Sequence, residues 1–205
     1  MKMMTFTWVR ICLNAVTNYF LVLLILACNI HDSEAVRFYA DQVFKHATCF
    51  DDTLNCLYLT AKTLAQAFKL EEYLMSTFAI IKKCGEDLPQ PMNENVVMGL
   101  QSMITTLHNM TDESILTMEM ATDKRVIFLM KLYAELANML HFINPSLSGA
   151  VSLRLADLTL RNGLTPLCPL AFVYLGMTLV NMGTEYTTQA CRLGECRMTS
   201  CLYFS

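Results

Sequence analysis

The chain has 205 residues, of which 54% are hydrophobic and 16% are charged, and its formal net charge is −3. This length suffices for one domain with a substantial core, or for one domain and an appendage. The composition excludes a strongly basic nucleic-acid-binding protein, because no run of lysine and arginine interleaved with aromatic residues appears. A chain this apolar needs part of its surface covered by a partner, a neighbouring domain or lipid.

Residues 1–30 form an apolar segment that has three interpretations. Within it, residues 11–28 are just long enough to span a bilayer, and Lys2 and Arg10 precede them. Two central asparagines weaken a membrane span, and the pattern of small residues near Ala27 is poor for signal cleavage. The segment is therefore a membrane anchor, a secretory signal or a packed first helix, unless the start of the chain is wrongly assigned.

Helical patterns with clear boundaries follow from Asp32 onward. Residues 32–45, 51–68 and 70–84 are each predicted to form a helix, and capping or acidic residues stand at their N-termini. The third has glutamates in its first turn, lysines in its last turn and Gly85 after it, which the helix dipole favours. The predicted apolar sides of the first two helices comprise Val36, Tyr39, Ala40, Val43 and Phe44, then Leu54, Leu57, Tyr58, Ala61, Leu64, Ala65 and Phe68.

The two helices within residues 51–85 match the size of one tetratricopeptide unit, which is about 34 residues long. Ala61, Ala65 and Ala79 supply small side chains where the two helices of such a unit approach closely. The strict consensus of the repeat is missing from this segment. We therefore expect a tetratricopeptide-like helix hairpin at this position.

A linker with Pro89 and Pro91 separates this hairpin from the next helix. Asn93 can cap a helix over residues 94–108, and a short turn over residues 111–118 follows it. The predicted buried stripe of the helix comprises Val97, Leu100, Ile104 and Leu107.

Residues 122–180 contain three apolar helices around which the rest of the chain is organised. The first ends at Asn144–Pro145, because the residue before a proline is pushed out of the α region, and Ser146 or Ser148 can cap the second. The predicted inward residues of these two helices are Val126, Met130, Tyr133, Ala137, Leu140, Val151, Leu155 and Leu158. The predicted outward residues are Lys131, Glu135, Asn138, Arg154, Asp157 and Arg161.

The second of these helices places Asp157 one turn from Arg161 and ends at Gly163, where glycine supplies a left-handed residue. The third begins near Pro166 and Pro169, which are tolerated in a first turn. It is apolar on nearly all sides. Such a helix must be covered on several sides, as in a stack of helix pairs.

No sequence motif for nucleotide binding or catalysis appears in the chain. It lacks a GxxxxGK[ST] loop, a GxGxxG after a strand, the kinase motif set and a GxSxG elbow. The carboxylate pairs Asp51–Asp52 and Glu71–Glu72 lie in predicted first turns of helices, where acidic residues are favoured for structural reasons. We predict no catalytic residues, no cofactor-binding residues and no enzymatic activity.

The histidines stand apart at His31, His46, His108 and His141, without the spacing of metal ligands. His108 and His141 lie near predicted helix C-termini, where a basic side chain interacts favourably with the dipole. A structural role is therefore predicted for both.

Nine cysteines are present, and their odd number and intrahelical positions, such as Cys56 and Cys84, predict reduced buried thiols. Cys191, Cys196 and Cys201 recur at steps of five, which would splay them around a helix, and no histidine lies near them. We predict no metal site.

Two weaker signals remain. Asn109-Met-Thr111 is a formal glycosylation sequon, which matters only if the chain enters the secretory route. Several methionines recur at helical spacing, which favours core filling over an adaptable binding groove. They are Met98, Met103, Met110, Met118 and Met120.

Four stretches carry a resemblance to a known group of proteins. They are ATCFDDTLNCLYLTAKTLAQAFKLEEYL, GEDLPQ, MTDESILTMEMATDKRVIFLMKLYAELA and NGLTPLCPLAFVYLGMTL. Through them, residues 34–194 resemble the tetratricopeptide-like helical region of multidomain signalling ATPases of diatoms and other microalgae, in which an ATPase module, often accompanied by a kinase module, precedes such helices. The resemblance implies a regulatory or partner-binding segment whose partner is a protein or the ATPase and kinase modules of a larger signalling protein.

The two ends of the chain depart from this resemblance. Residues 1–30 do not resemble a preceding repeat, and the ending CRLGECRMTSCLYFS fits neither a repeat nor a polar cap. We interpret both ends as a truncation or as wrongly assigned gene boundaries. The nucleotide-binding residues of the ATPases have no counterpart in this chain, so no such role is transferred.

The sequence thus predicts an all-α fold of tetratricopeptide-like antiparallel helix hairpins stacked as a short solenoid. Residues 31–190 form this array, between the hydrophobic segment 1–30 and an irregular tail over residues 191–205. The predicted function is non-catalytic protein interaction or regulation in the cytoplasm. The alternative is a single-pass membrane-anchored or secreted helical protein, such as a cytokine-like bundle, with residues 11–28 in the membrane.

Overall fold

A computed structural model describes the backbone of residues 2–193, and side chains from residue 13 onward apart from those of 112, 116 and 185. The helices in chain order are α1 (Lys2–Asn29), α2 (Ser33–His46), the 3-10 helix η1 (Phe50–Thr53), α3 (Leu54–Gln66), α4 (Leu70–Lys83), α5 (Glu94–His108), α6 (Asp112–Leu116), α7 (Lys124–Ile143), α8 (Pro145–Asn162), α9 (Cys168–Met182) and the 3-10 helix η2 (Thr184–Tyr186). Residues 187–193 are also helical. Between residues 2 and 193 there is no strand, only an isolated bridge from Met120 to Leu164, so the predicted all-α class is confirmed.

The chain divides into two compact units, Met1–Gly85 and Glu86–Ser205. Gly85 stands at the boundary with φ +86°, a left-handed conformation that glycine adopts without strain. Helices α1 to α4 form the first unit, so the apolar segment 1–30 folds together with the helices that follow it. The predicted boundary after residue 30 falls in the turn between α1 and α2.

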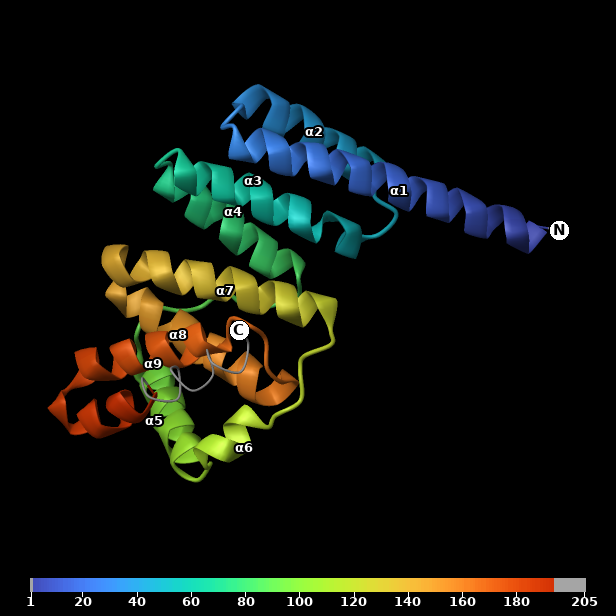
Figure 1. The fold of residues 1–205 in the computed structure, drawn as a ribbon. Coiled ribbons are helices and arrows are strands. Elements are labelled where there is room, and N and C mark those ends of the chain that lie inside the picture. The colour runs from blue at the N-terminus through green and yellow to red at the C-terminus, as the bar shows by residue number, and fades with distance from the viewer. Residues whose placement is uncertain (1, 194–205) are drawn as a thin grey trace. The chain divides into compact units, whose positions relative to one another are not determined.

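The first unit consists of two helix pairs, α1 with α2 and α3 with α4 (Figure 1). The turn between α1 and α2 is short because Asp32 caps α2, with its Oδ1 accepting hydrogen bonds from the backbone N–H groups of Glu34 and Ala35. Such a short connection makes the two helices antiparallel neighbours. The α3–α4 pair is the helix hairpin predicted over residues 51–85.

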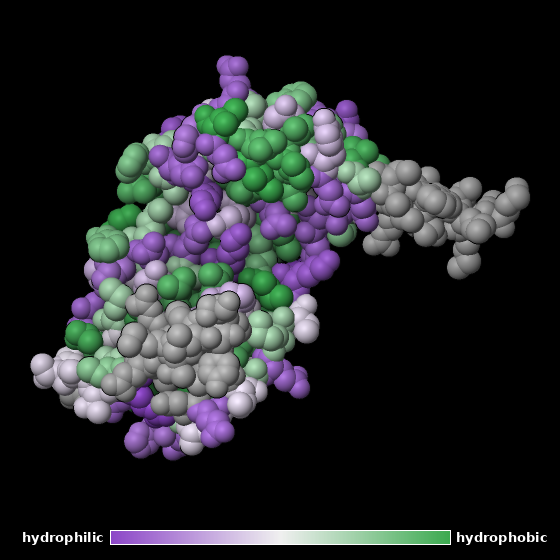
Figure 2. Space-filling model, in the orientation of Figure 1, coloured by the Kyte–Doolittle hydropathy of each residue, from purple (hydrophilic) through white to green (hydrophobic). Residues whose placement is uncertain are grey.

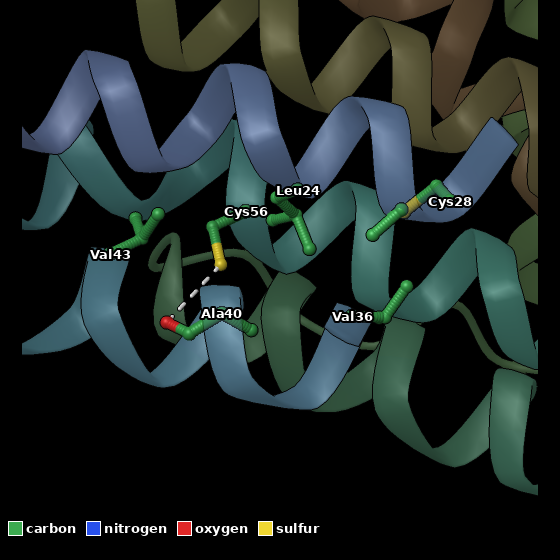
Figure 3. Packing of buried hydrophobic residues seen from close by; sticks show 7 residues of the cluster. Leu24, Cys28, Val36, Ala40, Val43 and Cys56 are labelled. Atoms are coloured by element: carbon green, nitrogen blue, oxygen red, sulfur yellow. Dashed lines mark hydrogen bonds between the residues drawn. The ribbon is translucent and has the colours of Figure 1, made fainter. Parts of the chain in front are cut away.

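A small apolar cluster holds α1, α2 and α3 together (Figure 3). Leu24 and Cys28 of α1 face Val36 and Val43 of α2, and the fully buried Cys56 of α3 donates a 3.8 Å hydrogen bond to a carbonyl of α2. The complete cluster is Leu24, Ala27, Cys28, Val36, Ala40, Val43 and Cys56. These are small and medium side chains, which lets the three backbones approach closely.

Some side chains of the first unit lie differently from the predicted apolar faces. Phe68 is 88% exposed because α3 ends at Gln66 and Phe68 adopts φ +57° in the turn before α4. Phe44 is exposed at the edge of α2, and Ala79 is exposed on α4 rather than enclosed between helices. For Phe44 and Ala79 the predicted helix is correct but the predicted burial is wrong, because burial depends on which neighbour covers each face, whereas Phe68 lies beyond the observed end of its helix.

The core of the second unit is formed by α7, α8 and α9, and α5 packs against α8. Every residue predicted to point inward in α7 and α8 is buried except Val126, which is half-buried. The largest fully buried side chains here are Met130, Leu132, Tyr133, Leu136, Leu140, Leu155, Phe172, Leu175 and Leu179. The third apolar helix predicted within residues 122–180 is α9, and it is covered by its neighbours as predicted, since most of its residues are buried.

The boundary between α7 and α8 lies at Asn144–Pro145 as predicted, but the cap is a different residue. Asn144 itself caps α8, because its side chain accepts a hydrogen bond from the N–H of Leu147. Ser146 instead accepts a 3.0 Å bond from the N–H of Met92, and Ser148 is buried. The predicted capping role of the two serines is therefore wrong, because a side chain at the boundary itself satisfies the free N–H first.

Candidate functional site

An open groove of about 780 Å³ lies in the first unit, between α2, α3 and the start of α4. Its lining mixes apolar and polar side chains. It comprises His31, Ser33, Val36, Arg37, Ala40, Asp41, Phe44, Leu57, Thr60, Thr63, Leu64, Gln66, Ala67, Lys69 and Ser76. We call it the α2–α3 groove. A lining that mixes apolar and polar side chains is typical of surfaces that bind amphipathic segments.

The helices position the side chains of the α2–α3 groove by their ordinary periodicity. Arg37, Asp41 and Phe44 recur at steps of four and three along α2, and Leu57, Thr60 and Leu64 do so along α3. At the rim, Lys69 forms a 3.3 Å ion pair with Glu72, and both side chains are more than half exposed. The lining of the groove carries charges of both signs, since Arg37 and Lys69 are basic and Asp41 is acidic.

The two threonine hydroxyls of the groove lie against backbone carbonyls of their own helix, α3. Thr60 Oγ1 lies within hydrogen-bond distance of the carbonyls of Cys56 and Leu57, and Thr63 Oγ1 donates to the carbonyl of Thr60 at 2.7 Å. A threonine engaged in this way is not activated as a nucleophile, because no general base shares its proton.

A second open groove, of about 610 Å³, lies between α5 and α8 in the second unit. One wall carries a chain of charges in which Arg154 binds Glu86 and Asp157, and Asp157 also binds Arg161. Burial alone would lower the pKa of Arg154, but its hydrogen bonds to Glu86 and the nearby carboxylate of Asp157 raise it. These charges satisfy one another, so the network is structural. The predicted placement of Asp157 one turn from Arg161 is confirmed by their 2.6 Å contact, and of the two only Arg161 is exposed, since Asp157 is half-buried.

A small pocket of about 220 Å³ lies where α5, α9 and helical residues 187–193 meet. Arg192 closes its edge, because Nη1 donates to the carbonyl of Leu107 at 3.1 Å and Nη2 donates to the carbonyl of Met110. The carbonyl of Leu107 lies in the last turn of α5, and that of Met110 lies in the turn that follows the helix. The arginine thus complements the negative end of the α5 dipole.

The histidines occupy separate places in the structure. His108 is the last residue of α5 and His141 lies in the last turn of α7, as predicted. His46 lies in the last turn of α2 and stacks on Phe20, with 5.6 Å between the ring centroids. His31 is exposed at the rim of the α2–α3 groove with φ +57°.

The acidic pairs lie at helix N-termini, as predicted. Asp52 Oδ2 accepts hydrogen bonds from the hydroxyl and N–H of Thr48, at 2.7 and 2.9 Å, and from the N–H of Cys49 at 3.2 Å. The hydroxyl of Thr48 is the main cause that lowers the pKa of Asp52. Glu71 and Glu72 lie in the first turn of α4. Neither pair is placed as an acid–base couple.

The cysteines that the structure describes are free thiols. Cys28, Cys56 and Cys168 are buried, Cys84 is half-buried, and Cys49 and Cys191 are exposed. Burial raises the pKa of the Cys56 thiol to about 12. No group of three histidine, cysteine or acidic residues between residues 13 and 193 is arranged to hold a metal ion. Cys196 and Cys201, and most of the predicted tail, lie outside the described residues.

The methionines and the sequon give mixed outcomes. Met103 is buried as a core residue, whereas Met98 and Met120 are exposed. Met110 and Met118 are half-buried. The core role is thus confirmed for Met103 and wrong for Met98 and Met120. The side chain of Asn109 is exposed just after α5, where the sequon is accessible.

Within the part of the chain whose side chains are described, one helix is long and apolar enough to cross a membrane. It is α7 (Lys124–Ile143), and half of its apolar stretch is buried within the second unit. Residues Leu13–Asn29 of α1 form a shorter apolar helix.

Sequence reasoning missed the α2–α3 groove, because a groove arises from how two helices pack rather than from either helix alone. No protein-family model, no curated protein and no solved structure matches this chain.

Proposed function

We propose that the chain is a non-catalytic interaction or regulatory segment, and that the α2–α3 groove binds an amphipathic helix of a protein partner. The observation that carries the proposal is the groove itself, an open hollow of about 780 Å³ with Leu57 and Leu64 among its apolar lining and charges at its rim. Amphipathic helices bind such grooves through apolar side chains spaced three and four residues apart. The polar rim then fixes their orientation.

The proposal includes a tetratricopeptide-like architecture, stacked as a short solenoid. Supporting it, the α3–α4 hairpin lies where the sequence predicts one repeat, and α3 also packs against the α1–α2 pair. In repeat proteins of this kind, adjacent helix pairs build an extended binding surface. The α2–α3 groove lies between two such pairs.

The partner that the sequence resemblance suggests is an ATPase or kinase module of a larger signalling protein, in the cytoplasm. The mixed charges at the rim favour a partner segment that itself carries both signs. A purified ATPase module of that group is therefore the probe of choice.

The test compares two arginine substitutions on the same helix. Thr60→Arg places a bulky charge in the groove, whereas Asn55→Arg adds the same side chain at an exposed position of α3 that does not line the groove. Titration calorimetry of the full chain against the ATPase module is expected to give at least about tenfold weaker binding for Thr60→Arg only.

Circular dichroism of both variants establishes that the helices persist. Equal affinity of the two variants would remove the groove from the interface. A lack of binding by the unmodified chain at high micromolar concentration would count against the proposed partner, and measured turnover of any substrate would overturn the non-catalytic assignment.

A further inference from the structure

Two charged side chains of the α2–α3 groove have no partner within the described residues. Arg37 and Asp41 both line the groove, both are exposed, and they stand one turn apart on α2. Among the residues whose side chains the structure describes, neither takes part in a side-chain ion pair or hydrogen bond. An arginine four residues before an aspartate is the less favourable order for a pair within one helix. Both charges are therefore available to a molecule that enters the groove.

The neighbouring charges are either engaged or placed outside the groove. Lys69, which also lines the groove, forms the 3.3 Å ion pair with Glu72. Glu34 and Lys45 flank the two available charges on α2, yet neither of them lines the groove. A molecule bound in the groove therefore meets one unengaged charge of each sign on its α2 wall.

The backbone of α2 places these two charges beside a buried floor. Val36 and Ala40 line the groove and are at most 7% exposed, and each is followed directly by one of the charged residues (Figure 3). Successive residues of an α-helix are about 100° apart around its axis, so each charge stands at the edge of the floor. From α3, Leu57 and Leu64 add apolar side chains two turns apart.

A helix that occupies this groove must match both features. Its apolar stripe covers the floor and the leucines, and its flank on the α2 side faces the two charges. Residues four apart are about 6 Å apart along any α-helix axis, so one acidic and one basic residue at that spacing can face Arg37 and Asp41 together. Two residues of equal charge would repel one of them. Figure 2 shows hydrophilic side chains bordering hydrophobic ones on the visible surface of the first unit.

We propose that Arg37 and Asp41 are the specificity-determining residues of the groove, and that it takes an amphipathic helix with one acidic and one basic residue, one turn apart, beside its apolar stripe. This inference rests on the proposed helix-binding function and adds the charge pattern of the partner. Exposed charge pairs contribute little affinity on their own. They discriminate between partners, because a wrong charge is repelled.

The experiment uses the full chain and three synthetic helical peptides that share one apolar stripe. Beside the stripe, at two positions four residues apart, the peptides carry one glutamate and one lysine, two glutamates, or two lysines. In titration calorimetry, the unmodified chain should bind the mixed peptide at least about threefold more tightly than either uniform peptide. The preference should shrink at high salt, because the charges are exposed.

Two charge reversals in the groove should redirect this preference. Asp41→Arg makes both charges basic and should favour the two-glutamate peptide, whereas Arg37→Asp makes both acidic and should favour the two-lysine peptide. The matched controls are Glu34→Lys and Lys45→Glu, which change the net charge by the same amounts on the same helix but outside the groove. Both controls should keep the preference for the mixed peptide. Circular dichroism verifies that all four variants remain helical.

Equal binding of the three peptides by the unmodified chain would overturn the proposal, as would the same order of preference in Asp41→Arg and Glu34→Lys. Thr60→Arg should weaken the binding of all three peptides, which assigns them to the groove. Equal binding together with this loss would remove only the charge selection and leave the helix-binding function standing. Binding of no peptide, or binding that Thr60→Arg does not weaken, would contradict the helix-binding function and this inference with it.

Discussion

Arg154 and Glu86 form a two-pronged ion pair, in which Nε donates to Oε2 and Nη2 donates to Oε1, each at 2.8 Å. Glu86 is the first residue of the second unit, and Arg154 lies in the middle of α8. The pair therefore fastens the start of this unit onto one of its core helices. Planar pairs of this type are stronger than a single charged contact.

Arg154→Ala is expected to destabilise the chain by about 1–2 kcal/mol, since Glu86 and Asp157 lose a shared partner while solvent screens part of the effect. Arg161→Ala serves as the matched control. Arg161 is 72% exposed and forms an ion pair with Asp157, so its loss should cost less than about 0.5 kcal/mol. Urea unfolding measures both. Equal costs would show that the Glu86 contact contributes nothing.

Gly163→Ala should destabilise the second unit by at least about 2 kcal/mol for two reasons. Alanine adopts the backbone conformation of this position only with strain, and its Cβ would clash with a neighbouring atom. Gly163 has φ +102°, and a Cβ there would lie 2.3 Å from the carbonyl oxygen of Glu119. Gly85→Ala provides the comparison, since Gly85 has φ +86° but no atom within 4 Å of its Cβ position. It should cost about 1 kcal/mol from strain alone. Comparing the loss of stability of the two variants in thermal unfolding separates the cost of the steric clash from the cost of backbone strain.

Asp52→Asn should remove an acid-sensitive part of the stability. The folded pKa of Asp52 lies below its unfolded value, mainly because the Thr48 hydroxyl donates to the charged carboxylate. The stabilisation is therefore complete above the unfolded pKa of about 3.9, and it is lost as the pH falls through the folded pKa. At pH 7 the variant should be about 1 kcal/mol less stable, and the two proteins should converge at low pH. Parallel urea curves that keep their separation in acid would contradict this account.

Thiol reactivity should follow burial. The exposed Cys49 and Cys191 should react with a maleimide in the folded chain, whereas Cys56 should stay unmodified because it is buried and its pKa is raised to about 12. The unfolded thiol ionises near pH 8.5, so Cys56 favours the folded state less as the pH rises above that value. Peptide mapping by mass spectrometry after labelling with and without urea reads out each site. Labelling of Cys56 without urea would show that the cluster opens readily.

Helix boundaries were predictable where the deciding groups are close in sequence. Asn93 caps α5 by accepting a 3.0 Å bond from the N–H of Val96, and the helix covers residues 94–108 as predicted. Asp32 acts in the same way on α2. A side-chain oxygen two or three residues before a free N–H needs no tertiary context, so the sequence alone identifies it.

Contacts between distant segments were not predictable. The carboxylate of Glu86 and the guanidinium of Arg154 lie 68 positions apart, and nothing in the local pattern links them. Phe68 fits the apolar period of α3, yet it is exposed because the helix ends before it. The α2–α3 groove escaped prediction for the same reason, since its lining comes from three helices whose packing no single periodicity encodes.

Arg192 has a practical consequence for anyone dividing this chain into pieces. Its guanidinium donates hydrogen bonds to the carbonyls of Leu107 and Met110, so helical residues 187–193 secure the C-terminal end of α5. A recombinant fragment that starts at Glu86 must extend through Leu193 to retain the hydrogen bonds of Arg192 to the end of α5. Truncation before Arg192 would leave the end of α5 free to fray, and protease cleavage near Asn109 would be its earliest sign.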